Sequence, residues 1–248
     1  MSIFDINKNY DFGDFLPSIS KLGINPTQSQ LNSIAVFFEL LVDENKSINL
    51  TSIVEWEAFL LRHILDSACL NLVFSENDYK SNLLDIGSGA GIPGFPIKIF
   101  NPGLKVQMMD STKKKIGFID KVVSQLGLTD TYSHHARAEE LGHDSEFRSQ
   151  FDYVTSRAVA ELPTLLELML PFVKQGGYAI AMKGESVNQE IQKSTKALNE
   201  LGGRIIKIVD PSEFIENYPG FLVVIEKIIE TPKRYPRRNG VPMKSPLI

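Results

Sequence analysis

Four glycines within eight residues form the stretch of this chain with the clearest capacity for chemistry. They follow a short apolar run, Leu83–Ile86, which predicts a buried strand, and they precede an apolar segment from Ile92 to Phe100, which predicts a helix. Glycine permits positive φ in a tight turn and lets a ligand touch bare backbone, and the start of a helix presents free N–H groups. The order of strand, glycine loop and helix therefore predicts the opening of a nucleotide-binding βαβ unit. The four positions are Gly87, Gly89, Gly91 and Gly94.

Two cofactors fit this loop. The last three glycines satisfy G-x-G-x-x-G, the dinucleotide pattern, whereas Asp85 with the first three satisfies D-x-G-x-G-x-G, the pattern of S-adenosylmethionine enzymes. A pyrophosphate is anionic and is disfavoured beside a carboxylate, but S-adenosylmethionine carries an ammonium and a sulfonium that a carboxylate stabilises. Asp85 therefore favours S-adenosylmethionine, and an NAD-dependent oxidoreductase remains the first alternative.

Two further positions suit a nucleoside. A second strand from Leu104 to Met109 is followed by Asp110, which lies 23 residues after Gly87, close to the spacing expected of an acid that binds ribose hydroxyls. A third strand, Thr131 to His135, is followed by Ala138 and Glu139, where the adenine is expected. Asp110 as an ordinary acid at a strand end is the alternative.

The acceptor side is predicted from polar residues at strand ends and on one helix. Arg157 follows a fourth strand, Phe151 to Thr155, and Lys183 ends a fifth, Tyr178 to Met182. Ligands bind at the carboxyl ends of strands in such sheets, so both are candidate catalytic residues. His63 lies on a predicted helix from Glu55 to Phe74 and shares a face with Asp66. A simple helix-face ion pair is the alternative for those two.

The remaining pattern predicts an α/β fold with a mostly parallel, Rossmann-like sheet. A helix from Thr112 to Leu126 and another from Leu162 to Leu170 alternate with the strands. Two late strands, Arg204 to Val209 and Phe221 to Lys227, are joined without a helix and predict an antiparallel hairpin at one edge. We expect three parts: an N-terminal helical cap (1–78), a cofactor-binding domain (79–230) and a basic Pro-rich tail (231–248).

Composition narrows the class of protein. Of 248 residues 43% are hydrophobic, no apolar run has the length of a membrane span, and the first residues lack a signal-peptide pattern. The single cysteine, Cys69, excludes an intramolecular disulfide or a cysteine zinc cage, and we expect it in the core. Adjacent strand residues His134 and His135 point to opposite faces, so they are a poor metal site. We expect a cytoplasmic monomer without a metal ion.

The charge is unevenly distributed. The net charge is −4, yet the last 18 residues contain five basic residues and no acid, which leaves 21 basic against 30 acidic residues in the rest. Prolines in this tail disfavour a regular helix. The pattern predicts an extended basic arm that orders on RNA, and a solubilising disordered end is the alternative.

Residues that are missing from the chain favour one class of methyl acceptor. Methylation of an exocyclic amine usually needs an Asn/Asp-Pro-Pro-aromatic clamp after the fourth strand, where this chain has Thr155-Ser-Arg-Ala158. Methylation at pyrimidine C5 needs a cysteine nucleophile, and Cys69 is in the wrong place. A ring nitrogen such as guanine N7 carries a free lone pair and no proton, so it requires positioning rather than a base.

Several stretches together resemble one known family, the bacterial small-subunit rRNA guanine-N7 methyltransferases, also called glucose-inhibited division protein B. They are Asn49-Leu-Thr-Ser52, Arg62-His-Ile-Leu-Asp-Ser67, Leu84-Asp-Ile-Gly-Ser-Gly-Ala-Gly-Ile-Pro-Gly94, Asp110-Ser111, Ser156-Arg-Ala158 and Lys183-Gly184. The match covers nearly all of residues 30–230. The Arg-His-Ile-Leu-Asp-Ser segment with the Gly-Ile-Pro-Gly ending is far more specific than the glycine loop alone.

The resemblance implies a class I methyltransferase fold and S-adenosylmethionine as the cofactor. It implies cofactor contacts at Gly87, Ile92, Ala138, Glu139 and Arg157, with Asp110 as the ribose partner. It further implies a guanine of 16S rRNA as the acceptor, within the small ribosomal subunit or its precursor. A non-catalytic RNA-binding module is the second alternative to this function, and a small-molecule methyltransferase is the third.

Overall fold

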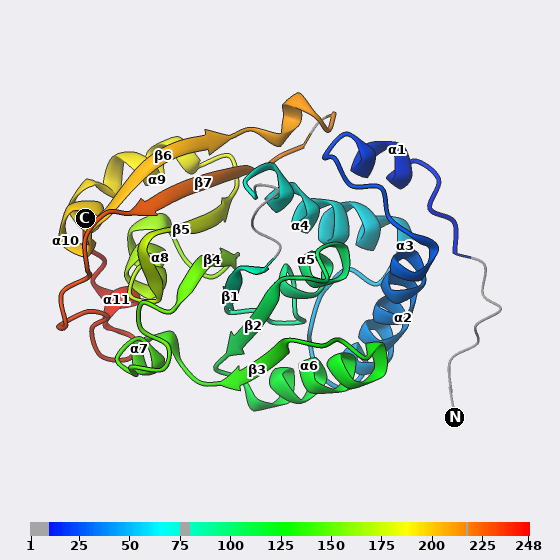
Figure 1. The fold of residues 1–248 in the computed structure, drawn as a ribbon, viewed down its shortest axis with the longest axis horizontal. Coiled ribbons are helices and arrows are strands. Elements are labelled where there is room, and N and C mark those ends of the chain that lie inside the picture. The colour runs from blue at the N-terminus through cyan, green and yellow to red at the C-terminus, as the bar shows by residue number, and fades with distance from the viewer. Residues whose placement is uncertain (1–9, 75–79, 217) are drawn as a thin grey trace.

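The structure is a computed structural model that describes residues 10–74, 80–216 and 218–248. In these ranges seven strands form one sheet in the order β3-β2-β1-β4-β5-β7-β6 (Figure 1). The strands are β1 (Asn82–Ile86), β2 (Lys105–Asp110), β3 (Thr131–His135), β4 (Phe151–Arg157), β5 (Val173–Lys183), β6 (Gly203–Val209) and β7 (Phe221–Lys227).

The sheet is parallel from β3 to β5 and antiparallel where β7 pairs with β5 and with β6. The predicted α/β class, the mostly parallel sheet and the antiparallel edge hairpin are therefore confirmed. The strand order reverses between β1 and β4, since the chain first builds outward through β2 and β3 and then returns. Such a reversal opens a crevice at the carboxyl ends of the strands, where ligands of these sheets bind.

Helices cover both faces of the sheet (Figure 1). One face carries α1 (Phe15–Ser20), α2 (Gln28–Asn45), α3 (Trp56–Phe59), the π-helical η1 (Leu60–Leu65), α4 (Asp66–Ala68), the 3-10 helix η2 (Cys69–Leu72), α5 (Gly94–Phe100) and α6 (Lys113–Leu126). The other carries α7 (Ala138–Leu141), α8 (Leu162–Met169), α9 (Val187–Lys193), α10 (Thr195–Leu201) and α11 (Val241–Lys244), and a short 3-10 turn, η4 (Pro211–Glu213), follows β6.

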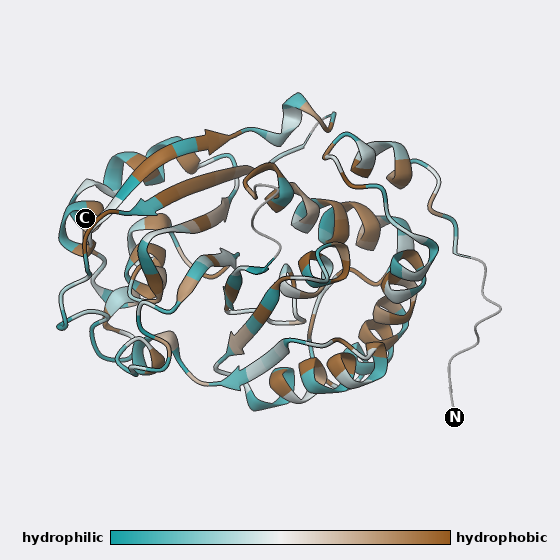
Figure 2. Cartoon of the chain, in the orientation of Figure 1, coloured by the Kyte–Doolittle hydropathy of each residue, from teal (hydrophilic) through white to brown (hydrophobic). Residues whose placement is uncertain are grey.

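Two hydrophobic clusters form the core, one on each face. Successive strand residues point to opposite faces, so Leu83 joins the cluster with the N-terminal helices and Leu84 joins the cluster with α8. Figure 2 shows β7 hydrophobic along most of its length, as a strand covered on both sides requires. The N-terminal helices thus share one core with the sheet. The expected boundary at residues 78 and 79 lies outside the described residues.

Local signals in the sequence explain several helix ends. Thr27 accepts a hydrogen bond from the Gln30 N–H and forms a capping box, which fixes the start of α2. Gly127 ends α6 with φ +60°, as the left-handed C-cap requires. Cys69 is fully buried, as expected. No helix among the described residues has the length and apolarity to cross a membrane.

The prediction of one regular helix from Glu55 to Phe74 is wrong, because the segment is helical but changes type along its length. It begins as α3, passes through the π turn η1 and ends in a 3-10 turn, although its expected inward residues are buried. The Ser67 hydroxyl donates to the His63 carbonyl at 2.6 Å, a side-chain bond that competes with the helical pattern. The His63 and Asp66 side chains of this segment both contact Arg157 at the end of β4.

The tail is also different from the expected extended arm. Residues 231–248 pack against α7, α8 and α10, and the segment contains the short helix α11, in which Pro242 occupies the first turn, where proline is tolerated. Arg237 forms an ion pair with the buried Glu167, and Arg234 pairs with Glu200. Two of the five tail cations are therefore neutralised by the body of the protein.

Candidate functional site

The carboxyl ends of five strands place the predicted site residues along one edge of the sheet. β1 leads into the glycine loop, β2 ends at Asp110, and β3 leads to α7. β4 ends at Arg157, which pairs with Met182 of β5, and β5 ends one residue later at Lys183. Parallel pairing thus gathers residues that are distant in the sequence at one edge, as the strand-end argument predicts.

The glycine loop is tightly packed on the sheet. Gly87 and Gly91 have φ of +72° and +78°, and a Cβ on Gly91 would lie 2.2 Å from the Phe95 ring. The N–H groups of Gly87 and Ser88 donate to the Met109 carbonyl at 2.9 and 3.0 Å, which fixes the loop to the end of β2. A side chain at Gly91 would collide with Phe95 of α5, and one at Gly87 would collide with Val159 after β4.

Asp85 lies beneath this loop and is almost fully buried. Its Oδ2 accepts the Gly94 N–H at 3.1 Å, whereas its Oδ1 has no hydrogen-bond partner among the described residues. Burial raises the pKa of Asp85 to about 7, against the lowering effects of Ser88, Gly94 and Arg157. A buried carboxylate with an unpaired oxygen is a compatible partner for a cationic group.

Asp110 connects the loop to α6. Its Oδ2 accepts the Gly89 N–H at 3.1 Å and its Oδ1 accepts the Thr112 N–H at 2.8 Å, while the Lys115 ammonium lies 3.6 Å from Oδ2. Each oxygen keeps a further lone pair that can accept a hydroxyl proton. The two backbone bonds hold the carboxylate in place for a diol such as that of ribose.

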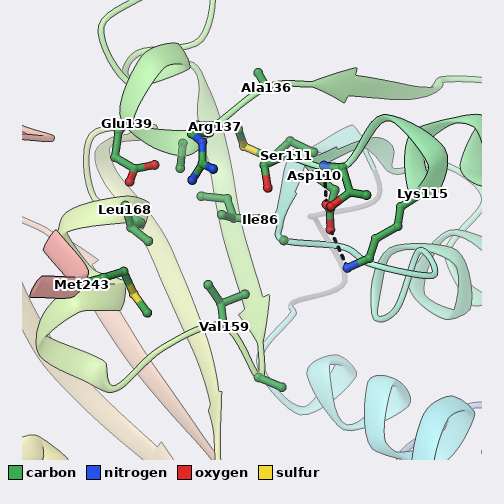
Figure 3. A pocket seen from close by; sticks show the side chains of 15 residues that line it. Ile86, Asp110, Ser111, Lys115, Ala136, Arg137, Glu139, Val159, Leu168 and Met243 are labelled. Carbon is green, nitrogen blue, oxygen red and sulfur yellow. Dashed lines mark hydrogen bonds and ion pairs between the residues drawn. The ribbon is translucent and has the colours of Figure 1, made fainter. Parts of the chain in front are cut away.

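A cavity of about 320 Å³ opens beside Asp110 (Figure 3). The Met243 and Leu168 side chains lie on one side of it, and Asp110 and Ser111 on the other (Figure 3). Its lining residues come from four strand ends, from α6, α7 and α8, and from the tail: Ile86, Gly87, Met109, Asp110, Ser111, Thr112, Lys115, Ala136, Arg137, Ala138, Glu139, Ala158, Val159, Leu168 and Met243.

A charged cluster surrounds Arg157 farther along the same edge. Its Nη1 lies 3.0 Å from Asp66 Oδ2, and its Nη2 lies 3.1 Å from His63 Nδ1. The Tyr218 hydroxyl bonds to the other oxygen of Asp66. Asp66 therefore pairs with Arg157 from β4 rather than with His63, so the simple helix-face ion pair is wrong.

His63 is buried within this cluster. Burial and, next, the positive charge of Arg157 lower the pKa of His63 to about 4, so the imidazole is neutral at pH 7. Its Nε2 lies 2.9 Å from the Thr51 hydroxyl. Its Nδ1 lies 3.1 Å from Arg157 Nη2 and 3.0 Å from the Arg62 carbonyl oxygen, so this nitrogen either accepts from the guanidinium or donates to the carbonyl.

Lys183 is paired inside the protein. Its ammonium lies 2.6 Å from Glu190 Oε2 and donates to the Ala160 carbonyl at 2.8 Å. Glu190 also accepts the Leu162 N–H at 2.7 Å, at the start of α8. Lys183 thus fastens the turn after β4, in which Ala158 has a positive φ of 56°.

The predicted residues divide into two groups. Gly87, Asp110, Ala138 and Glu139 line the cavity. The others lie along the adjoining edge without lining it: Asp85, Gly89, Gly91, Ile92, Arg157, Lys183 and His63. Sequence reasoning missed Leu168 and Met243 as wall residues and Tyr218 as a partner of Asp66. No local motif marks these three, since each reaches the site only through the fold.

These side chains fit S-adenosylmethionine better than a dinucleotide. Asp85 keeps an unpaired oxygen beneath the glycine loop, outside the cavity lining, and Asp110 offers lone pairs for the ribose hydroxyls. Ala138 and Leu168 supply apolar wall for a base. A dinucleotide pyrophosphate would instead have to lie near the carboxylates of Asp85 and Asp110, which is unfavourable.

Comparisons with known proteins agree with this geometry. Residues 30–212 match the family described as rRNA small subunit methyltransferase G. A ribosomal RNA small subunit methyltransferase G of Desulforamulus reducens is 42% identical over 89% of this chain and 92% of its own. The protein of that name from Lachnoclostridium phytofermentans is 41% identical over 96% and 98%. A solved Aquifex aeolicus structure, titled as a SAM-dependent methyltransferase, shares the fold with a TM-score of 0.52, at 16% identity over 69% of this chain and 93% of its own.

Proposed function

The chain belongs to the rRNA small subunit methyltransferase G family, and on this basis we propose that it transfers a methyl group from S-adenosylmethionine to N7 of one guanine in 16S rRNA. The observation that carries the proposal is the Asp110 carboxylate, held by two backbone N–H groups at the mouth of the cavity beside the glycine loop. Asp110 binds the ribose hydroxyls, and Ala138 and Glu139 line the space for the adenine. The glycines bring the backbone to the methionine part, near the unpaired oxygen of Asp85.

This reaction requires the protein mainly to position guanine N7 against the methyl group. When bound, S-adenosylmethionine supplies a methyl group on a sulfonium, and the N7 lone pair forms the new C–N bond as the C–S bond breaks and S-adenosylhomocysteine leaves. Guanine N7 loses no proton, so no side chain has to act as a base. The neutral, fully engaged His63 is consistent with such a reaction.

We assign roles to the acceptor-side residues on the same reasoning. Arg157 is a cation held at the sheet edge by Asp66, and we propose that it binds an anionic group of the cofactor or the RNA. His63 keeps the guanidinium in place. Lys183 fastens the turn that carries Ala158 and Val159, both in the cavity wall. His63 and Lys183 are in this view positioning residues.

Labelled S-adenosylmethionine tests the proposal directly. We expect the purified chain to label small ribosomal subunits or their precursors at a single guanine, mapped by chemical cleavage at N7-methylguanine. Asp110→Ala should abolish labelling by removing the ribose partner. Labelling of another atom would overturn the acceptor, and binding of NAD without binding of S-adenosylhomocysteine would overturn the cofactor.

The same proposal extends to the RNA partner, the cellular compartment and the oligomeric state. The RNA partner is 16S rRNA within the small subunit or its precursor, so we propose action in the cytoplasm. We also propose that the chain works as a monomer. Light scattering of the purified protein measures this, and a stable dimer would contradict it.

A further inference from the structure

The C-terminal tail supplies a wall of the cofactor cavity. Met243, on α11, lines the same space as Asp110 and Glu139, although more than 100 residues separate it from either (Figure 3). Its side chain is 56% exposed and lies beside Leu168 in the view of Figure 3, so an apolar surface faces the cavity. A thioether side chain adapts well to the face or edge of an aromatic ring.

The tail is held in this position by specific bonds rather than by general packing. Arg237 Nε lies 2.9 Å and Nη2 2.6 Å from the two oxygens of Glu167, and its backbone N–H donates to Glu167 at 2.7 Å. The Glu167 side chain is fully buried. A bidentate guanidinium is the partner that such a carboxylate needs, so this pair acts as a latch between the tail and α8.

Two further contacts place α11 over the cavity. The Gly240 N–H donates to Glu139 Oε1 at 3.0 Å, directly before α11. The Thr164 hydroxyl donates to the Pro242 carbonyl at 3.1 Å, within α11. Glu139, expected to meet the adenine, thus also determines where Met243 lies.

We infer that the tail, through Met243 and the Arg237–Glu167 latch, forms the adenine-side wall of the cofactor site and is a determinant of cofactor affinity. The apolar face that Met243 shares with Ala138 and Leu168 fits a planar purine, and the opposite side of the cavity carries the polar groups for the ribose. The inference rests on the proposed cofactor site and deepens it. It also gives the basic tail a ligand other than RNA.

Titration calorimetry with S-adenosylhomocysteine on the full chain tests this wall. We expect Met243→Ala to weaken binding about fivefold to tenfold, which corresponds to the removal of roughly one to two buried methylene groups from the wall. Met243→Leu should retain affinity within about twofold, since it conserves the apolar volume. Lys244→Ala, on an exposed neighbour outside the cavity lining, is the matched control and should be unchanged.

Two arginine substitutions, one in the latch and one beside it, test the Arg237–Glu167 pair. Arg237→Ala should weaken binding at least as much as Met243→Ala, because it releases the tail and leaves Glu167 unpaired. Arg238→Ala removes the same charge from an exposed residue for which the described residues offer no ion pair, and it should bind like the wild type. Because Met243 is exposed, its variants remain informative even if Arg237→Ala unfolds.

A shorter probe locates the effect. 5′-Methylthioadenosine keeps the adenine and ribose but lacks the amino acid, so Met243→Ala should weaken its binding by the same factor. Wild-type affinity of Met243→Ala for both compounds, with binding abolished in Asp110→Ala, would overturn the inference and leave the proposed function intact. Failure of the wild-type chain to bind S-adenosylhomocysteine would overturn both.

Discussion

At the scale of single residues, the site depends on charges that the fold removes from water. Asp85 is almost fully buried, keeps one oxygen without a partner among the described residues, and lies close enough to Arg157 for that charge to affect its ionisation. Arg157 in turn is held between Asp66 and His63. Buried charges of this kind cost stability, and they persist where a ligand uses them.

The raised pKa of Asp85 predicts a specific pH dependence of stability. The pKa is about 7 in the folded chain, because of burial, and 3.8 in its absence, so the folded state holds more protons between these values. The contribution of Asp85 to stability is therefore complete below pH 3.8 and is lost as the pH rises through about 7. We expect the free energy of unfolding of the wild type to fall relative to that of Asp85→Asn by roughly 2 kcal/mol between about pH 5.5 and 8.5. Urea titrations of both proteins measure this difference, and a pH-independent difference would contradict it.

We predict that no other cationic side chain can replace Arg157. Arg157→Ala should lower methyl transfer on the order of 100-fold, as the loss of a positioned charge does. Arg157→Lys should not restore it, because an ammonium lacks the fork that reaches Asp66 and His63 together. Single-turnover rates measure the loss. Arg204→Ala, on an exposed arginine of the edge strand β6, is the control, and an equal loss there would refute a local role.

At the scale of elements, the contact between α5 and the sheet sets the geometry of the loop. Gly94 opens α5, its N–H is fixed by Asp85, and a Cβ there would lie 2.6 Å from the Met108 sulfur on β2. The helix can approach the strand closely only because this position has no side chain. The last glycine of the pattern therefore serves packing between α5 and β2.

A pair of glycine substitutions separates these packing effects. Gly94→Ala should destabilise the chain by about 1–3 kcal/mol through overpacking against Met108. Gly117→Ala, at an exposed position inside α6 with no atom near a new Cβ, should instead stabilise by up to about 1 kcal/mol. Chemical denaturation reports both values. Destabilisation of equal size at both positions would mean that the tight packing at Gly94 is not the cause.

At the scale of the whole molecule, the net negative charge of the chain opposes the binding of RNA, which is also negatively charged. The net charge is −4, and the tail uses Arg234 and Arg237 within the protein. Exposed cations remain beside the strand ends: Arg62, Lys113, Lys114 and Arg137. We propose that these four residues orient the RNA over the cavity. In this arrangement the N-terminal helical block forms part of the acceptor wall.

Salt dependence measures this orientation. Binding to small subunits should weaken with salt, because each protein cation that meets a phosphate releases a counterion. Lys113→Ala, Lys114→Ala and Arg137→Ala should each reduce the slope of log affinity against log salt by roughly 0.7–0.9 for every phosphate that the wild-type side chain neutralises. Lys207→Ala, on the exposed face of the edge strand β6, should leave the slope unchanged. Equal effects of all four substitutions would indicate binding without a defined face.

Alternation of apolar runs and the positions of glycines are local properties. For this reason the sequence alone determined the fold class, the strands and the residues at the strand ends. Gly87, Asp110, Ala138 and Glu139 follow directly from strand ends and line the cavity. The tertiary structure decided what meets across the chain: Asp66 with Arg157, Lys183 with Glu190, and the tail with α7 and α8. A sequence shows that a tail is basic, but only packing brings a carboxylate such as Glu167 within hydrogen-bond reach of it. That pairing packs a charged segment, expected as an extended arm, against the body of the protein beside the cavity.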